Sequence, residues 1–310
     1  MLKDPGKHIG DTWYYIEENI CHCFYLTCPD TQPRHQCWDI AHATSRDLIH
    51  WTKHGIVIPK GQDGEWDCSC LSTGSVIRFD NRYWMAYSGK WDGEIVQIGL
   101  AVSDDLHTWK KCNWNPVCKP DGELYAKRGR GVRTFCHWRD PFLFIDGGKV
   151  YMITCATHPD APADGCGTIG ICCTEDMRHW RLLPPIAIDP IAQELECPQI
   201  LQIEDRYILL FSCYEKLFCH RLQQKYGAAL RQTSYYMTSN HRWGPYQFEE
   251  QLQLLPMYET DRNRSVQYAN RLIQFKSRWF LMGTVWSEQG DYIADPMEYS
   301  LLDGKLCLNK

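Results

Sequence analysis

The sequence lacks the features that mark a membrane-spanning or secreted chain. No run of 18 apolar residues occurs among its 310 residues, so we expect no transmembrane helix. The first residues, MLKDPGKHIGD, contain no apolar core of the kind that a secretory signal peptide needs. We therefore expect a soluble protein without a cleaved leader.

The chain also lacks a large excess of positive or negative charge. The chain has 33 Lys and Arg against 38 Asp and Glu, which gives a net charge of −5 at pH 7. Chains that bind nucleic acids or anionic membranes carry basic patches that draw them to phosphate groups. We therefore expect neither a nucleic acid nor a membrane as a partner, and the sequence leaves the oligomeric state open.

Cysteine is abundant, but its spacing lacks the C-x-x-C pairs of common zinc sites. Among the 17 cysteines, Cys21 with Cys23 and Cys68 with Cys70 are separated by a single residue. No two of the 12 histidines have a metal-ligand spacing either, so we predict neither a metal nor another cofactor. Cysteines in this number, without a secretion signal, are expected to be reduced and buried, which favours a cytoplasmic location.

One pattern recurs along the whole chain. Its unit is a hydrophobic strand, a short turn that carries Gly, Asp or Asn, and a second, more apolar strand. Five copies begin at Tyr14, Val76, Phe142, Ile200 and Leu272. Alternating β-branched and aromatic residues around polar turns are typical of antiparallel hairpins.

A second motif, S/T-x-D-φ-x-x-W (φ is apolar), alternates with the hairpins. It reads SRDLIHW at 45–51, SDDLHTW at 103–109 and TEDMRHW at 174–180, and a looser copy is TSNHRWGPY at 238–246. Near-identical copies cannot each be the single active site. We therefore expect Ser or Thr and Asp to close a turn, and Trp to fill the space between neighbouring units.

Together the two motifs predict about four strands in each unit and no long amphipathic helix. Regular all-β repeats of this length are typical of a propeller. We predict an all-β, five-bladed β-propeller with four antiparallel strands per blade, formed by residues 1–310 as a single domain without an appended β-sandwich. We also expect the last strands, within residues 291–308, to complete the blade that begins near residue 14.

In a propeller the innermost strand of each blade lines the central axis, so the residues that precede these strands should converge. Three of the five positions carry a carboxylate, namely Asp11, Asp140 and Glu196; the other two read STGS (72–75) and QYAN (267–270). Carboxylates crowded in one pocket repel each other when ionised, which raises the pKa of at least one and makes it a proton donor.

Two carboxylates on either side of a bond are the groups that glycoside cleavage needs. A third, kept ionised by a neighbouring Arg, can accept hydrogen bonds from sugar hydroxyls and stabilise the positive charge of the transition state. The Arg139–Asp140 pair suits this third task. The sequence therefore favours a glycosidase whose partner is a small saccharide.

Five segments resemble, in the correct order, the motifs of glycoside hydrolase family 32, the β-fructofuranosidase-like family of five-bladed propellers. They are IGDTWYYIEENICHCFYL, SRDLIHW, STGSV, WRDPFLF and ECPQI, and the resemblance runs from about residue 9 to 214. It implies a retaining mechanism, without a metal, in which Asp11 is the nucleophile and Glu196 the acid/base. Asp140 corresponds to the residue that stabilises the transition state.

Further residues are expected to contact the sugar. Tryptophan faces pack against the apolar C–H surfaces of sugar rings, although propeller cores also use Trp. The resemblance places the small residues at 72–75 and the Cys after Glu196 near the substrate. The predicted substrate-binding set is Arg139, Trp13, Ser72, Thr73, Cys197, Trp66 and Trp286.

Several alternatives stay open. Glu194 lies two residues before Glu196 and is a second candidate acid. Because the first motif reads IGDTW rather than the family's usual Trp-x-Asn-Asp-Pro stretch, another furanose is compatible with the site. An inverting enzyme similar to glycoside hydrolase family 43, acting on arabinose, xylose or galactofuranose, is one alternative. A furanosyl transferase and a noncatalytic binding propeller are the others. The Arg-rich segment 127–140 would suit a phosphorylated substrate, but a solvated loop is the simpler interpretation.

Overall fold

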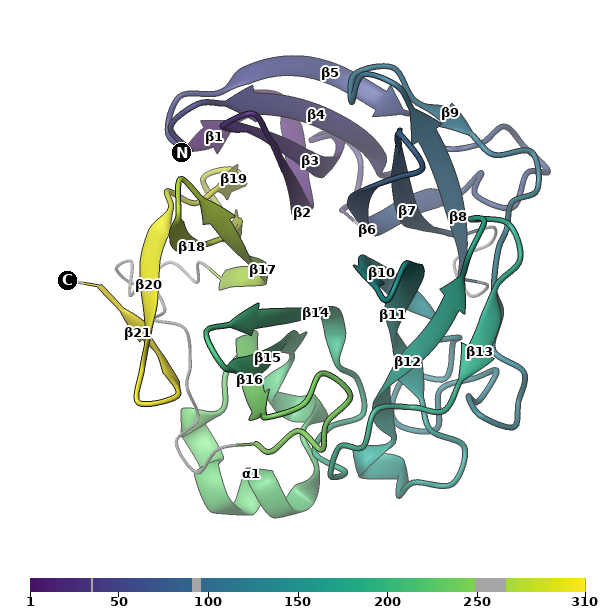
Figure 1. The fold of residues 1–310 in the computed structure, drawn as a ribbon, viewed down its shortest axis with the longest axis vertical. Coiled ribbons are helices and arrows are strands. Elements are labelled where there is room, and N and C mark those ends of the chain that lie inside the picture. The colour runs from purple at the N-terminus through teal and green to yellow at the C-terminus, as the bar shows by residue number, and fades with distance from the viewer. Residues whose placement is uncertain (35, 91–95, 249–265, 310) are drawn as a thin grey trace.

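Five antiparallel sheets surround a central axis in the computed structural model, which describes residues 1–34, 36–90, 96–248 and 266–309 (Figure 1). The innermost strands are β2, β6, β10, β14 and β17, one from each sheet. The predicted five-bladed β-propeller is therefore confirmed. None of the helices in the described part of the chain combines the length and apolar character that crossing a membrane requires.

The first three blades each contain four strands that follow one another along the chain. Blade 1 consists of β2 (Lys7–Glu17), β3 (Ile20–Pro29), β4 (Asp39–Ser45) and β5 (Thr52–Ile58). Blade 2 consists of β6 (Cys70–Phe79), β7 (Arg82–Lys90), β8 (Val96–Ser103) and β9 (Lys110–Lys111). Blade 3 consists of β10 (Arg139–Asp146), β11 (Lys149–Thr157), β12 (Gly167–Thr174) and β13 (Arg181–Leu183), with the 3₁₀ turn η1 (Ala163–Gly165) before β12.

Within the described part of the chain, blade 4 has three strands. Its sheet contains β14 (Glu196–Ile203), β15 (Arg206–Cys213) and β16 (Thr233–Ser239). Among the described residues, an isolated bridge between Thr238 and Gln247 marks the fourth position. The connection from β15 to β16 holds η2 (Glu215–Leu217), the short helix α1 (His220–Tyr226) and η3 (Gly227–Ala229).

Blade 5 closes the ring in a different way from the one the sequence suggested. It consists of β17 (Val266–Phe275), β18 (Arg278–Trp286), β20 (Met297–Leu302) and β21 (Lys305–Leu308), with β19 (Tyr292–Ile293) also paired to β18. The expectation that the C-terminal strands complete blade 1 is wrong, because β2 to β5 already fill that blade. The ring is closed by β1 (Leu2–Lys3), which pairs with β19.

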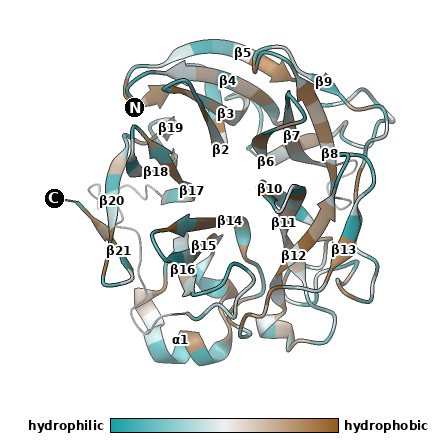
Figure 2. Cartoon of the chain, in the orientation of Figure 1, coloured by the Kyte–Doolittle hydropathy of each residue, from teal (hydrophilic) through white to brown (hydrophobic). Residues whose placement is uncertain are grey.

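The hydrophobic core lies between the blades rather than within one central mass. One cluster joins Phe24 of blade 1 to Met85 and Tyr87 of blade 2. Three others join blades 2 and 3, 3 and 4, and 4 and 5, and a fifth joins blade 5 to blade 1. Figure 2 shows hydrophobic residues along strands such as β8, β12 and β14, and mostly hydrophilic residues in the loops. Burial of the facing sheets therefore holds each blade against its two neighbours.

The outer turns have the structural role that their repetition predicted. Ser45 Oγ accepts hydrogen bonds from the backbone N–H groups of Asp47 and Leu48, at 3.2 and 2.8 Å. Asp47 Oδ1 in turn accepts from two further backbone N–H groups. In the other two copies Asp105 and Asp176 likewise accept from two backbone N–H groups, and their own N–H groups donate to Ser103 and Thr174. The Trp109 ring lies edge-on to Phe24 of the preceding blade, with centroids 5.6 Å apart. The motif therefore closes a turn and fills the space between blades.

Candidate active site

Every inner strand contains a β-bulge near its beginning. The register breaks fall between Ile9 and Thr12, Ser72 and Gly74, Arg139 and Phe142, Glu196 and Gln199, and Tyr268 and Arg271. A bulge takes a residue out of the ladder and re-aims its side chain. Asp140, Cys197 and Ala269 occupy three of these bulges with φ angles of 58°, 51° and 50°.

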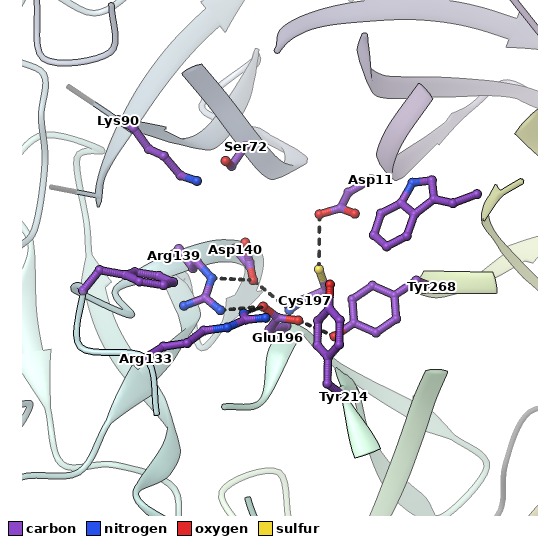
Figure 3. A pocket seen from close by; sticks show the side chains of 12 residues that line it. Asp11, Ser72, Lys90, Arg133, Arg139, Asp140, Glu196, Cys197, Tyr214 and Tyr268 are labelled. Atoms are coloured by element: carbon purple, nitrogen blue, oxygen red, sulfur yellow. Dashed lines mark hydrogen bonds and ion pairs between the residues drawn. The ribbon is translucent and has the colours of Figure 1, made fainter. Parts of the chain in front are cut away.

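A cavity of about 240 Å³ lies where these bulges meet, at the end of the central axis (Figure 3). All three predicted carboxylates, Asp11, Asp140 and Glu196, line it. The remaining lining residues are Ser72, Lys90, Arg133, Phe135, Arg139, Cys197, Tyr214, Tyr268 and Trp286. Residues separated by up to 275 positions in the chain thus share one pocket because the inner strands converge.

Asp11 is held from blades 2 and 4. Its Oδ2 accepts a hydrogen bond from the Thr73 hydroxyl and lies 3.7 Å from the Cys197 thiol sulfur. Burial raises the pKa of Asp11 to about 6, and the charges of Asp140 and Glu196 act in the same direction. The Thr73 hydrogen bond opposes that shift because it favours the ionised carboxylate.

Asp140 is fixed through its backbone and its side chain. Its N–H donates to Ser88 Oγ at 2.8 Å, and its Oδ2 accepts from the backbone N–H of Cys197 at 3.0 Å. Burial raises the pKa of Asp140, while the charge of Arg139 lowers it. The net shift is upward because burial outweighs the charge of Arg139, which favours the ionised form.

Arg139 instead makes its short contacts with two glutamates. Its Nη2 lies 2.5 Å from Glu194 Oε2 and 2.6 Å from Glu196 Oε1, whereas its Nε is 3.7 Å from Asp140 Oδ2. Arg133 Nη1 reaches the same two glutamates at 3.0 and 3.3 Å. Two guanidinium groups therefore position the glutamate pair. Sequence neighbours are not the closest partners here.

The two glutamates differ in their access to the cavity. Glu196 lines the pocket, and its Oε2 accepts a hydrogen bond from the Tyr268 hydroxyl. Glu194 is fully buried, outside the lining, and its Oε1 lies 3.4 Å from His137 Nε2. Glu194 thus anchors the arginines, and only Glu196 is placed to meet a ligand.

Cys197 connects all three carboxylates. It follows Glu196 directly, its N–H donates to Asp140, and its thiol lies against Asp11. Its carbonyl accepts a 2.8 Å hydrogen bond from Nη1 of Arg271, a fully buried residue of blade 5. The charge of Arg271 lowers the pKa of Asp11 and so partly offsets the effect of burial.

Of the three tryptophans expected to meet a sugar, one reaches the pocket. Trp286 lines it beside Tyr268, with ring centroids 5.5 Å apart. The expectation that Trp13 lies in the pocket is corrected: its side chain is buried between blades 1 and 2 and stacks on Phe24. Trp66 is a second correction, because it packs on Tyr87 and lies outside the lining.

The two small residues predicted at the start of blade 2, Ser72 and Thr73, differ in whether they reach the pocket. Ser72 lines the pocket, whereas Thr73 is fully buried and contacts Asp11 instead of the cavity. Thr73 therefore acts on a ligand only through that carboxylate.

Several residues that line the pocket were not among those predicted from the sequence. Lys90 and Trp286 are the last residues of β7 and β18, the second strands of blades 2 and 5, and Tyr214 directly follows β15, the second strand of blade 4. In an antiparallel hairpin the end of the second strand lies beside the start of the first, as in the Cys70–Lys90 pair. The ends of the second strands are therefore a sequence signal for pocket residues, as the starts of the first strands are. Phe135 and Arg133 lie in a loop, where no such rule applies.

A propeller with three carboxylates around one axial pocket has the groups that glycosidic bond cleavage requires. The sequence matches the Glycosyl hydrolases family 32 N-terminal domain over residues 11–298, and the chain therefore belongs to this family. The resemblance noted from the motifs is thus confirmed.

Individual relatives are more distant. The sucrose-6-phosphate hydrolase of Lactococcus lactis subsp. lactis is 24% identical over 220 residues, which cover 68% of this chain and 41% of that protein. The chain thus spans about two fifths of the length of the curated relatives it matches.

Solved structures share the fold. An inulosucrase from Halalkalicoccus jeotgali bound to kestose has a TM-score of 0.76 at 20% identity and covers 98% of this chain and 87% of its own. A thermostable family-43 glycoside hydrolase has a TM-score of 0.71 at 16% identity, and the match covers 100% of this chain and 96% of that protein. At these identities the similarity concerns the propeller and does not separate the two families by activity.

Proposed function

We propose that this chain cleaves terminal furanosides of small saccharides, with β-fructofuranosides as the preferred substrates, and that it retains the anomeric configuration. The observation that carries this proposal is the convergence of Asp11, Asp140 and Glu196 on one pocket, joined by Cys197. Membership of family 32 supports the choice of a furanosidase, and the names of relatives such as sucrose-6-phosphate hydrolase support a fructoside.

In the proposed reaction, Glu196 protonates the glycosidic oxygen while Asp11 attacks the anomeric carbon. The bond to the leaving sugar breaks, and a covalent glycosyl ester forms on Asp11. Glu196 then removes a proton from water, which attacks the same carbon and releases Asp11 as a carboxylate. The Tyr268 hydroxyl and the Arg139 guanidinium hold Glu196 in place during both steps.

Asp140 has a separate role in this proposal. It is fixed by Ser88 and by the Cys197 N–H, so its remaining acceptor capacity is directed into the pocket. Hydrogen bonds from sugar hydroxyls to this carboxylate would strengthen as positive charge develops on the ring. Asp140 therefore stabilises the transition state without a covalent step.

The size of the pocket supports action on a terminal sugar. Its volume of about 240 Å³ is below the range of roughly 300–1,000 Å³ that is common for ligand pockets. Trp286 and Phe135 contribute aromatic surface to the wall. Lys90 contributes a cation (Figure 3). Lys90 is the specific reason to include a phosphorylated sucrose among the substrates tested, since an ammonium group recognises phosphate.

The first experiment compares wild type with Glu196→Gln on aryl furanosides, sucrose and sucrose 6-phosphate. We expect turnover of a fructoside, a kcat reduced about 10³-fold in the variant, and retained configuration by NMR. Inversion would favour the enzyme similar to family 43. Absence of turnover, with both proteins folded by circular dichroism, would favour a transferase or a binding propeller.

The pH dependence gives a second test. Asp11 must be ionised to attack, and burial raises its pKa to about 6 in the ligand-free pocket. We therefore expect kcat/KM to rise as the pH increases through about 6. A rate that is constant between pH 4.5 and 7 would contradict the assignment of Asp11 as nucleophile.

A further inference from the structure

Four histidines gather where blade 2 meets blade 1, away from the pocket lining. His22, His42 and His54 lie on the neighbouring strands β3, β4 and β5, and His107 comes from the outer turn between β8 and β9. One ligand atom from each of His42, His54 and His107 lies within 4.8 Å of the other two. We propose that these three side chains bind a divalent transition-metal ion, with Zn²⁺ as the reference ion, and that the ion links the two blades.

His42 supplies the buried ligand. The residue is fully buried, and its Nε2 lies 3.1 Å from His22 Nδ1. Its Nδ1 is also buried and has no hydrogen-bond partner among the described residues. A buried polar atom without a partner is costly and therefore rare in folded proteins.

The contact with His22 explains which nitrogen is available. If Nε2 of His42 carries the proton and donates it to His22 Nδ1, then Nδ1 of His42 presents a lone pair. Metal-bound histidines almost always donate their other ring N–H to a fixed acceptor in this way. Phe24 stacks on the His42 ring with centroids 4.6 Å apart, which further limits the ring's rotation.

His54 and His107 supply the exposed side of the site. The His54 ring centroid lies 4.8 Å from that of His42 and 4.8 Å from that of His107. The His54 Nε2 lies 2.9 Å from Thr44 Oγ1, a contact that would orient this ring as His22 orients His42. Because both side chains are exposed, an ion can enter from solvent.

The distances suit a zinc ion after small ring rotations. Zn–N bonds of about 2.0–2.1 Å place two ligand nitrogens roughly 3.4 Å apart in a tetrahedral site. In the structure the three ligand atoms lie within 4.8 Å of one another, which is a longer separation. Rotation of the exposed His54 and His107 rings can bring their nitrogens closer to His42. Three imidazoles leave a fourth position for water.

The repeat explains how His107 reaches the neighbouring blade. It occupies the fifth position of the outer turn motif, where blade 1 has Ile49 and blade 3 has Arg178. The Arg178 guanidinium reaches back over Trp114, which follows β9 of blade 2, at 5.5 Å from the ring centroid. Side chains at this position thus extend toward the preceding blade, and in blade 2 the side chain is an imidazole.

The test uses tag-free full-length protein treated with chelator and then dialysed. Calorimetric titration with ZnCl₂ should show one high-affinity ion per chain, and Zn²⁺ should raise Tm because it binds the folded state. Co²⁺ should give visible absorption bands of a four-coordinate nitrogen site. His107→Ala and His54→Ala should each weaken Zn²⁺ binding about 100-fold or more, because loss of a ligand exceeds the 10–100-fold effect of losing a supporting group.

His179→Ala is the matched control. His179 is an exposed histidine in the equivalent turn of blade 3, where its Nδ1 lies 2.7 Å from Asp176 Oδ2. This variant should bind Zn²⁺ as the wild type does. Equal Zn²⁺ binding by wild type, His107→Ala and His54→Ala would overturn the proposal, as would wild-type protein whose Tm does not change with Zn²⁺. Because both ligand variants alter exposed side chains, their folding can be verified by unchanged circular dichroism.

Discussion

The outer turns and the inner strand bulges of this propeller both recur from blade to blade. The outer turns keep the same residue types at equivalent positions, whereas the bulges do not. Blades 1, 2 and 3 use Ser or Thr, Asp and Trp at the same turn positions. The bulges of the five inner strands instead carry Asp11, Thr73, Asp140, Cys197 and Ala269. Repeated residues thus accompany a repeated structural task, and divergent residues accompany the site.

The physical reason is the environment of each position. An outer turn satisfies its own backbone N–H groups, so the same residues solve the same local problem in each blade. Of the bulge residues, Asp11, Asp140 and Cys197 line one shared cavity, and Thr73 contacts Asp11 beside it. Each of these positions meets different neighbours, so no single residue type suits all five. Substitutions at the pocket should therefore change activity strongly, and substitutions at the outer turns should change stability slightly.

Asp11→Asn should abolish most of the activity. An amide of almost the same shape cannot form the covalent intermediate, so we expect kcat to fall by at least about 10⁴-fold. The measurement is steady-state turnover of the best fructoside substrate, with folding followed by circular dichroism. Asp205→Asn, at an exposed hairpin turn of blade 4, is the control and should keep full activity. An active Asp11→Asn enzyme would move the nucleophile to another residue.

The same variant should change how stability depends on pH. Burial raises the pKa of Asp11 to about 6, so the folded chain binds this proton more tightly than the unfolded chain. That contribution is fully present below about pH 4 and is lost as the pH rises through about 6. It corresponds to roughly 3 kcal/mol in the free energy of unfolding. Urea unfolding at pH 4 and pH 7 should show a smaller decrease for Asp11→Asn than for wild type.

Trp286→Ala should weaken substrate binding more than it slows the chemical step. Loss of an aromatic wall removes contacts with the sugar, and we expect KM to rise about 10-fold to 100-fold. Trp243→Ala is the control, because Trp243 packs on Phe144 and Tyr151 at an outer turn. A comparable KM change in both variants would remove the distinction between the pocket and the outer turns.

Tyr268→Phe should have an intermediate effect. The variant removes the hydroxyl that donates to Glu196 Oε2, while the ring beside Trp286 remains. The loss of one such hydrogen bond is worth about 1 to 1.5 kcal/mol, so we expect kcat to fall about tenfold. Tyr214→Phe is the matched control, since Tyr214 lines the same pocket with its ring against Arg133. Equal losses would assign the effect to the pocket wall in general.

Asp176→Ala should leave activity unchanged and lower stability slightly. Asp176 accepts hydrogen bonds from the backbone N–H groups of Arg178 and His179. The hydrogen bonds from His179 contribute most to holding the pKa of Asp176 below its usual value. We expect a loss of about 1 kcal/mol at pH 7. Because the pKa of Asp176 is lowered in the folded state, this contribution should begin to decrease below about pH 4 and be lost only as the pH falls through the lowered folded pKa, so the loss of stability should be smaller at pH 3 than at pH 7. Thermal unfolding at pH 7 and pH 3 tests both statements, and a large kcat effect would contradict them.

Much of the fold was predictable because it rests on local signals. The hairpin units and the outer turns are contiguous segments, and their period defines five blades. Closure of the ring was not predictable in this way. The two-residue strand β1 pairs with β19 near the other end of the chain, Leu2 with Ile293 and Lys3 with Tyr292, and carries no pattern of its own.

The site was predictable in part. Convergence of the inner strands brought Asp11, Asp140 and Glu196 together as expected. Trp13 was misplaced because it lies two residues after Asp11, where strict alternation would put both on one face. The bulge between Ile9 and Thr12 changes that alternation, so Trp13 packs between the blades. A register shift of this kind has no clear sequence signal.

By itself the sequence determined the number of blades, the turn chemistry and the three carboxylates at the axis, because each depends on short motifs repeated in order. Only the tertiary structure decided which groups meet. It paired Arg139 with Glu194 and Glu196, brought Trp286 to the pocket, and gathered histidines from two blades. These contacts depend on how blades pack and where bulges fall. They join residues too far apart in the chain for spacing to reveal.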